Sequence, residues 1–194
     1  MKHIPIIDIS PLRKTGSEEA LQNLSQEISQ ACQTHGFFYI SNHGVEISLQ
    51  EKLEKLSHEF FSQREEEKMK IAMSKGGKAW RGYFPVGNEL TSGKPDIKEG
   101  IYFGQELEES HPKVKAEIPL HGKNLFPYFP SAFRETVLEY MQQVTEVGHC
   151  VMKGISLSLG LPANYFDEKY AHDPLILFRI FHYPAQKEVE KNWG

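Results

Sequence analysis

Residues 177–184, LFRIFHYP, hold much of the fold information in this 194-residue chain. Aromatic and β-branched residues dominate the segment and Pro184 closes it, a composition typical of a β-strand that stops at a proline. Alternate side chains share one face of an extended strand, so Arg179 and Tyr183 should lie on the same side of a sheet. The segment therefore predicts a strand that presents a basic and a phenolic side chain together.

Composition excludes several broad classes of protein. The chain has 22 Lys and Arg against 26 Asp and Glu, a net charge of −4, and its basic residues are mixed with glutamates, which argues against nucleic-acid binding. No apolar run is long enough to cross a bilayer. With Cys32 and Cys150 alone, we expect neither a disulfide framework nor a zinc–cysteine site. A cytoplasmic protein with reduced thiols is the resulting expectation.

The hydrophobic spacing before residue 177 predicts an α+β fold without internal repeats. A loop-rich section over residues 76–129 separates the regular elements, and loops of that length are usually functional or disordered. The charged run 64–70 is expected to carry the second helix into solvent. The predicted elements are an edge strand over 4–9, a helix from Ser17 to Gly36, a buried strand over 37–40, a helix from Ser48, a strand over 99–103 and a helix from Ser131 to Gly160.

Four segments together resemble one enzyme family, the isopenicillin-N-synthase-like oxygenases that depend on Fe(II) and 2-oxoglutarate. In order along the chain they are IPIID at 4–8 followed by GFFYISNHGV at 36–45, DIKEGIYFG at 96–104, LGLP at 159–162, and 179–184. The loop GNELTSGKPD at 87–96 is additionally similar to the bacterial ethylene-forming enzyme, a member that uses 2-oxoglutarate.

This resemblance implies a jelly-roll (double-stranded β-helix) core with helices packed outside it. It also implies Fe(II), 2-oxoglutarate as co-substrate, O₂, and a small, amino-acid-like substrate; the metal would supply the difficult chemical step. We expect residues 1–130 to form the N-terminal oxygenase region with its substrate-side loops. Residues 131–194 would then form the long helix and the first strand of the jelly roll.

The resemblance assigns substrate-side roles to three residues. Arg81 matches an arginine that holds a substrate carboxylate, a task that suits a bidentate guanidinium; a solvent-facing loop arginine is the alternative. Glu89 and Thr91 match substrate-loop positions of the ethylene-forming enzyme, where a carboxylate would favour a cationic group on the substrate. For these two, ordinary polar loop residues are the alternative.

The strand over 177–184 is expected to face the cofactors. In the family, the face that holds Arg179 and Tyr183 looks toward iron and 2-oxoglutarate, so both are predicted cofactor-binding residues; simple core packing is the alternative. Phe181 departs from plant members, which often have Asn there to contact the co-substrate.

The iron ligands themselves are not expected within these 194 residues. None of the nine histidines begins His-x-Asp or His-x-Glu, whereas the family holds iron with two histidines and one carboxylate. We therefore predict no catalytic and no metal-ligating residue here, an incomplete barrel, and no turnover by this chain alone. A fragment of the family's enzyme, whose activity resides in a longer polypeptide or with a complementing chain, is one expectation. A non-catalytic binding module is another, and an isopenicillin-N-synthase-type oxidase without 2-oxoglutarate is a third.

Overall fold

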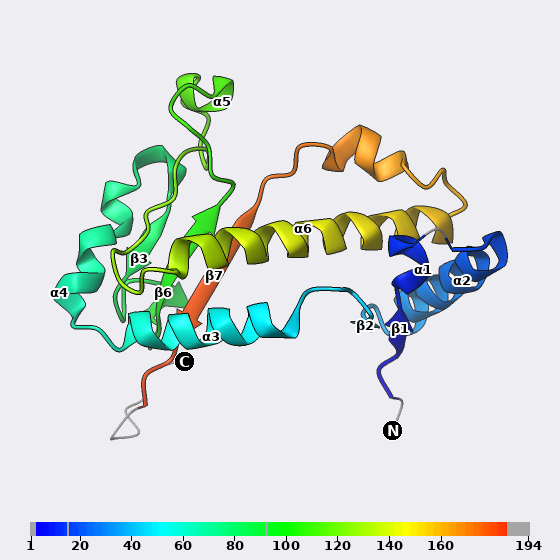
Figure 1. Cartoon of the computed structure of the whole chain (residues 1–194), viewed down its shortest axis with the longest axis horizontal. Helices are drawn as coiled ribbons and strands as arrows, with labels where there is room; N and C mark the ends of the chain where they lie inside the picture. Colours follow the sequence, from blue (N-terminus) through cyan, green and yellow to red (C-terminus); the bar gives the residue numbers. More distant parts are fainter. Residues whose placement is uncertain (1–2, 15, 92, 186–194) are drawn as a thin grey trace. The chain divides into compact units, whose positions relative to one another are not determined.

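The computed structural model describes residues 3–14, 16–91 and 93–185, and the chain divides into two compact units (Figure 1). Unit 1 consists of Met1–Ile47 and Tyr140–Pro174, and unit 2 of Ser48–Glu139 and Leu175–Gly194. The long helix α6 (Phe133–Ser158) contributes to both. Each unit is described by itself.

Unit 1 is a parallel two-stranded ribbon packed on helices. Strands β1 (Ile6–Asp8) and β2 (Tyr39–Ser41) pair in parallel, joined by α1 (Ser10–Arg13) and α2 (Glu18–Thr34). A π-helical turn, η4 (Asp167–Ala171), follows α6. The core consists of side chains at most 5% exposed: Ile7, Ile9, Leu12, Leu24, Ile28 and Ala31.

Helix α2 confirms the boundaries predicted from its ends. The Ser17 hydroxyl accepts a hydrogen bond from the backbone N–H of Ala20 at 3.2 Å, as an N-cap residue does. Gly36 follows the helix with φ +78°, a left-handed conformation that glycine adopts without strain.

Unit 2 contains an antiparallel sheet with strand order β3 (Gly82–Phe84), β6 (Glu99–Gly104) and β7 (Leu177–His182). A small hairpin pairs β4 (Leu90–Thr91) with β5 (Lys94–Pro95). Helix α3 (Ile47–Phe61) precedes the sheet. The short helices are α4 (Glu65–Lys68), η1 (Met69–Ile71), η2 (Met73–Lys75), η3 (Gly77–Ala79) and α5 (Pro112–Lys115).

The unit 2 sheet has two chemically different faces. On the face covered by α3 and the start of α6, Phe60 stacks on Phe133 with ring centroids 5.8 Å apart, and Phe103 meets Phe133 edge-on. We call this the helix face. The opposite face, here called the aromatic face, holds Tyr102 of β6 with Arg179 and Phe181 of β7, because residues paired across strands share a face.

Two local predictions were wrong. The strand over 37–40 was expected to be buried, yet Phe37 and Tyr39 are 59% and 60% exposed, since helices cover one side of the ribbon only. The run 64–70 was expected to carry the second helix into solvent. Most of it is exposed, but α3 ends at Phe61, a separate helix α4 follows, and Lys68 is buried, where it pairs with Glu99.

The overall class is as predicted: helices and strands are mixed and no barrel closes among the described residues. The division at residue 130 stays a prediction about domains, while the compact units follow another division in which residues 140–174 pack with the N-terminal ribbon. No described helix is both long and apolar enough to span a membrane.

Candidate active site

Four rings form a continuous cluster on the aromatic face. Tyr102 lies at its centre, with ring centroids 5.1 Å from Trp80, 5.6 Å from Phe84 and 6.2 Å from Phe181. Gly100 leaves the space for two of them, since a Cβ there would approach ring atoms of Phe181 and Phe84 to 2.6–2.7 Å. Trp80 is half exposed, so the cluster has a rim open to solvent.

Two cations lie over these rings. The Arg179 guanidinium carbon is 5.1 Å from the Phe181 ring centroid and 5.6 Å from that of Tyr102, and Lys98 Nζ is 4.8 Å from Phe181. Such cation–π contacts are favourable when partly desolvated. Lys98 also pairs with Asp96 at 2.8 Å and Glu89 at 3.1 Å, and its pKa is raised mainly by the Asp96 hydrogen bond.

Tyr102 connects two residues that the sequence nominated separately. Its hydroxyl donates a hydrogen bond to Glu89, while the Arg179 guanidinium lies over its ring. Burial, and then the bond to Glu89, raise the pKa of the Tyr102 phenol, so it stays protonated and keeps donating. The structure thus brings Glu89 and Arg179 to one site. Sequence reasoning missed Trp80, Lys98 and Tyr102 there.

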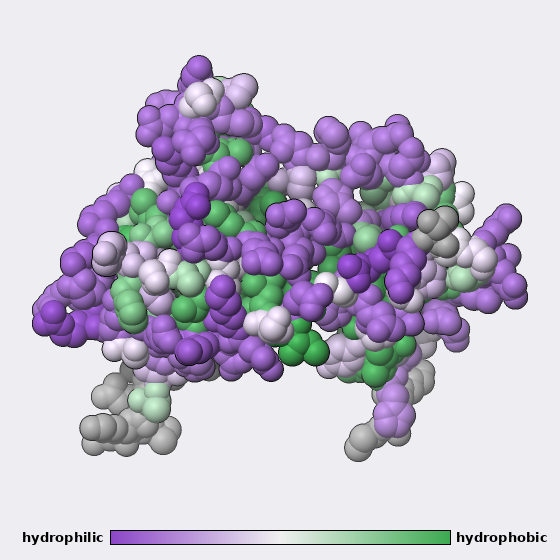
Figure 2. Space-filling view, viewed as in Figure 1, coloured by the Kyte–Doolittle hydropathy of each residue, from purple (hydrophilic) through white to green (hydrophobic). Residues whose placement is uncertain are grey.

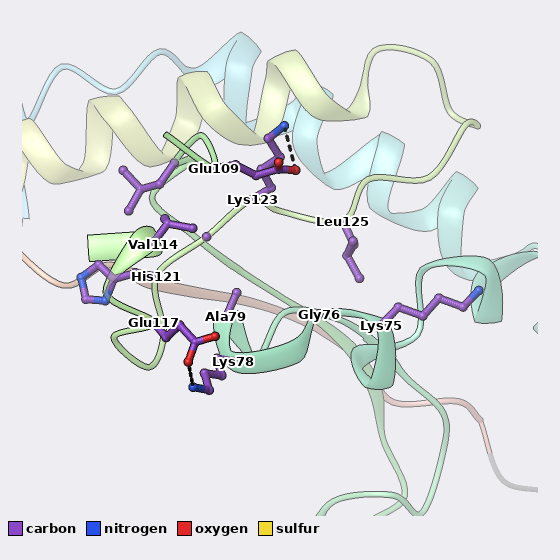
Figure 3. Close-up of a pocket in the computed structure, with 12 residues that line it drawn as sticks. Lys75, Gly76, Lys78, Ala79, Glu109, Val114, Glu117, His121, Lys123 and Leu125 are labelled. Carbon is purple, nitrogen blue, oxygen red and sulfur yellow. Dashed lines mark hydrogen bonds and ion pairs between the residues drawn. The ribbon is translucent and has the colours of Figure 1, made fainter. Parts of the chain in front are cut away.

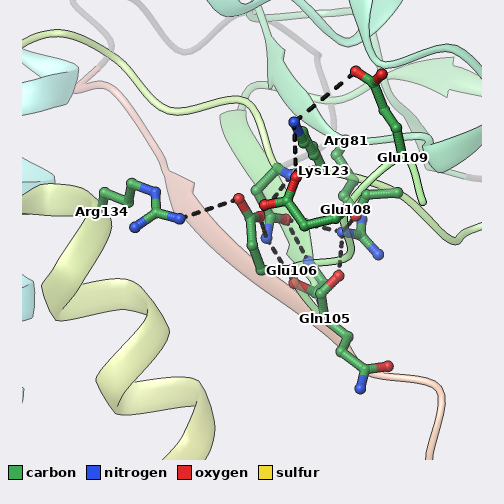
Figure 4. A network of polar contacts seen from close by, with 10 residues as sticks. Arg81, Gln105, Glu106, Glu108, Glu109, Lys123 and Arg134 are labelled. Carbon is green, nitrogen blue, oxygen red and sulfur yellow. Dashed lines mark hydrogen bonds and ion pairs between the residues drawn. The ribbon is translucent and has the colours of Figure 1, made fainter. Parts of the chain in front are cut away.

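Arg81 is buried, and its guanidinium belongs to a network of polar contacts (Figure 4). Its Nη1 donates to the carbonyl oxygens of Gln105 and Gly122 at 2.7 and 2.6 Å, and its Nη2 to that of Leu120 at 2.9 Å. Burial lowers the pKa of Arg81, and the Glu106 carboxylate acts in the opposite direction.

Arg81 therefore holds the 105–122 loop against the start of β3. The alternative of a solvent-facing loop arginine is wrong. Substrate-carboxylate binding by Arg81 stays a prediction, and a substrate would have to compete with acceptors already in place.

Two other predicted site residues, Thr91 and Tyr183, lie outside the aromatic cluster. The backbone of Thr91 belongs to β4, but its side chain is outside the described part of the chain. Tyr183 follows the last residue of β7 and is exposed. Their binding roles stay predictions.

A buried charged network lies on the helix face. The Glu99 carboxylate is 2.6 Å from Lys68 Nζ, 2.5 Å from the Tyr83 hydroxyl and 2.8 Å from His182 Nδ1. Burial alone would raise the pKa of Glu99, but the three partners together outweigh it and the pKa is lowered. The network joins α4, β3, β6 and β7. It therefore holds together the three strands that form the aromatic face.

A separate cavity of about 390 Å³ lies between η2, η3 and the 107–125 loop (Figure 3). Two of its lysines pair with carboxylates that line it, Lys78 with Glu117 at 2.5 Å and Lys123 with Glu109 at 3.9 Å, and Lys75 Nζ donates to the carbonyl oxygen of Lys70 at 2.8 Å. Because these lysines already have partners, the aromatic face is the stronger candidate site.

Of the two expected cofactors, the described side chains suit 2-oxoglutarate but not Fe(II). Among the described residues, no three His, Cys, Asp or Glu side chains gather as an iron site requires. We therefore derive no step at iron from these residues. The Arg179 guanidinium, in contrast, has the geometry to bind a carboxylate such as those of 2-oxoglutarate.

Comparison with known proteins identifies the class to which this fold belongs. Residues 4–128 match the family model described as non-haem dioxygenase in morphine synthesis, N-terminal. The chain belongs to this family, the isopenicillin-N-synthase-like oxygenases that use Fe(II) and 2-oxoglutarate.

Individual relatives support this family assignment. A probable iron/ascorbate oxidoreductase of Dictyostelium discoideum is 49% identical over 95% of this chain and 53% of its own length. The 1-aminocyclopropane-1-carboxylate oxidase of Dictyostelium mucoroides is 36% identical over 95% of this chain and 50% of its own. The crystal structure of a full-length Neurospora crassa protein in complex with alpha-KG superposes with a TM-score of 0.72 and 28% identity, covering 93% of this chain and 54% of that one. The chain thus spans about half the length of these relatives.

Proposed function

We propose that this chain is part of a non-haem Fe(II), 2-oxoglutarate-dependent oxidoreductase that acts on a small, amino-acid-like molecule. The iron ligands would come from polypeptide outside the 194 residues, within a longer protein or a complementing chain. The 1-aminocyclopropane-1-carboxylate oxidase supports the substrate class, because its named substrate is an amino acid. The Neurospora crassa complex with alpha-KG supports the co-substrate.

Arg179 carries the proposal. It is exposed above the Tyr102 and Phe181 rings, and no carboxylate of the described residues forms an ion pair with it. The other cation of the face, Lys98, is already neutralised by Glu89 and Asp96. Among the described residues of the aromatic face, the Arg179 charge is therefore available for an anionic ligand, above the Tyr102 and Phe181 rings.

In this arrangement each group has a separate task. Arg179 binds and orients a carboxylate of 2-oxoglutarate, whose oxidative decarboxylation accompanies substrate oxidation in the family. The Tyr102 phenol fixes the Glu89 carboxylate by hydrogen bonding. Glu89, which pairs with Lys98 at 3.1 Å, would share its carboxylate between Lys98 and the amino group of a substrate.

The test is calorimetric titration of the chain with 2-oxoglutarate. We expect Arg179→Met to weaken binding at least tenfold, because the ion pair is lost while the aliphatic stem is retained. The matched control is Arg64→Met, which removes an exposed arginine paired with Glu66 at 3.8 Å and should leave the affinity unchanged. Equal affinities for wild type and Arg179→Met would contradict the role of Arg179 and favour the oxidase without 2-oxoglutarate.

A further inference from the structure

The pairing of β6 with β7 decides where Arg179 lies. Tyr102 is its direct cross-strand partner, and Glu99 is the direct partner of His182 at the end of β7. The two pairs lie on opposite faces of the sheet, because successive side chains of a strand alternate between faces. A shift of β7 by two residues would keep every side chain on its face, but it would move Arg179 roughly 7 Å along β6, away from Tyr102.

The aromatic face specifies this register weakly. On this face of β6, Tyr102 has a glycine on each side, Gly100 and Gly104. A shifted β7 would pair Tyr102 with Leu177 or Phe181, and either side chain can pack on a ring. Register is poorly determined in strands that are rich in glycine. Another part of the sheet must therefore fix the position of β7.

On the helix face, a shift would break the pair of Glu99 and His182. It would place Ile180 or Pro184 opposite Glu99, and neither side chain can donate to a carboxylate. The other pairs on this face are apolar, so their members can exchange partners at little cost. They are Ile101 with Ile180 and Phe103 with Phe178. Hydrophobic residues also gather over the sheet of unit 2 in Figure 2, so the carboxylate would lose its partner in apolar surroundings.

His182 serves a carboxylate oxygen that the rest of the network leaves to it. Glu99 Oε2 accepts from Lys68 at 2.6 Å and from Tyr83 at 2.5 Å, whereas Oε1 lies 2.8 Å from His182 Nδ1. An ionised carboxylate only accepts, so Nδ1 carries the proton. The Glu99 side chain is 5% exposed, which makes the loss of a donor costly. The imidazole also stacks on Phe61, with ring centroids 5.3 Å apart.

We propose that Glu99 and His182 are positioning residues whose hydrogen bond fixes the register of β7 on β6. In that register the Arg179 guanidinium lies over the Tyr102 and Phe181 rings. A buried polar group that sets the register of its neighbours is a known use of such groups, as with a single asparagine in a coiled coil. The consequence for 2-oxoglutarate rests on the proposed function, in which Arg179 binds a carboxylate, whereas the register itself does not.

The test compares His182→Phe with His182→Asn in the 194-residue chain. Phenylalanine keeps a ring to stack on Phe61 but has no donor, whereas asparagine keeps an N–H donor but has no ring. The register is measured by nuclear Overhauser effects between the backbone protons of Tyr102 and Arg179. Co-substrate binding is measured by calorimetric titration with 2-oxoglutarate.

We expect His182→Phe to lower the intensity of these Overhauser effects and the affinity for 2-oxoglutarate together, each at least about threefold. The reason is that apparent affinity scales with the population in the competent state. His182→Asn should retain both. The matched control is His58→Phe, the same change at an exposed histidine of α3 that lies 3.9 Å from Glu54; it should leave both unchanged.

The remaining outcomes separate the register from the proposed function. Unchanged Overhauser effects in His182→Phe, or their loss in His182→Asn, would overturn the positioning role. If the wild-type chain does not bind 2-oxoglutarate, the proposed function fails, and the Overhauser effects still decide whether the pair fixes the register. A register lost in His182→Phe without a change in affinity would uphold the role of the pair and refute Arg179 as the carboxylate ligand.

Discussion

Glu99 shows at the scale of one residue how the sheet of unit 2 is held. Its carboxylate is buried and has three polar partners, of which only Lys68 is a permanent cation. Removing one member of a buried ion pair leaves the other charge desolvated, which typically costs about 3–5 kcal/mol. The same network makes Glu99 a strong candidate for acid sensitivity.

We predict that Glu99→Gln lowers the free energy of unfolding by about 3 kcal/mol, because Lys68 is then buried without a counter-charge. Urea denaturation followed by circular dichroism measures this. The control is Glu66→Gln, which breaks an exposed 3.8 Å pair with Arg64 and should cost about 0–0.5 kcal/mol. A loss as small as that of the control would mean that the network contributes nothing to stability.

The pH dependence follows from the sign of the Glu99 shift. The pKa of Glu99 is lowered in the folded protein, whereas an unfolded glutamate titrates near about 4.3. Its contribution is therefore present above that value and is lost as the pH falls through the folded pKa. We expect the stability difference between wild type and Glu99→Gln to be full at about pH 7 and to shrink below about pH 4. A difference that stays constant down to about pH 3 would contradict the assignment.

Residues whose roles depend on distant partners could not be predicted from the sequence. Glu99 lies 31, 16 and 83 positions from Lys68, Tyr83 and His182, and no local pattern encodes such separations. Glu89 and Arg179 were nominated by resemblance, but their junction at Tyr102 depends on the pairing of β6 with β7. Arg81 was also nominated by resemblance, and nothing in its sequence neighbourhood predicts that backbone carbonyls would surround its guanidinium.

At the scale of elements, helices were easier to predict than the ribbon. The apolar stripe Leu49, Leu53, Leu56 and Phe60 is buried on α3 as its spacing predicts. The strands β1 and β2 have only three residues each, too few for a repeated apolar pattern. The sequence therefore indicated the strands but not which of their faces would be covered.

Helix α6 offers a matched pair of glycines for a packing prediction. A Cβ on Gly154 would lie 2.6 Å from Ile28 Cδ1 and 3.0 Å from Leu12 Cδ1, both in the unit 1 core, whereas one on Gly148 meets nothing. We expect Gly154→Ala to destabilise by about 1–2 kcal/mol through overpacking. Gly148→Ala should stabilise by about 0.5–1 kcal/mol through helix propensity. Thermal denaturation of both variants tests this, and a stabilising Gly154→Ala would show that the three helices do not pack closely there.

At the scale of the whole molecule, the chain is a family member about half as long as its relatives. We have proposed a carboxylate site at Arg179 on its aromatic face, and its described residues include no three-ligand metal cluster. The chain alone should therefore bind 2-oxoglutarate without decarboxylating it. We predict that the purified 194-residue chain binds 2-oxoglutarate through Arg179 but does not decarboxylate it when Fe(II), ascorbate and O₂ are supplied.

The measurement is release of labelled CO₂ from 2-oxoglutarate, with and without Fe(II), alongside a titration of Fe(II) binding. The control is the chain co-expressed with the part of the Dictyostelium discoideum relative that lies outside the match, which should release CO₂ because the complementing polypeptide supplies the iron ligands. Micromolar Fe(II) affinity together with CO₂ release by the chain alone would refute the prediction, and would place the metal ligands within these 194 residues.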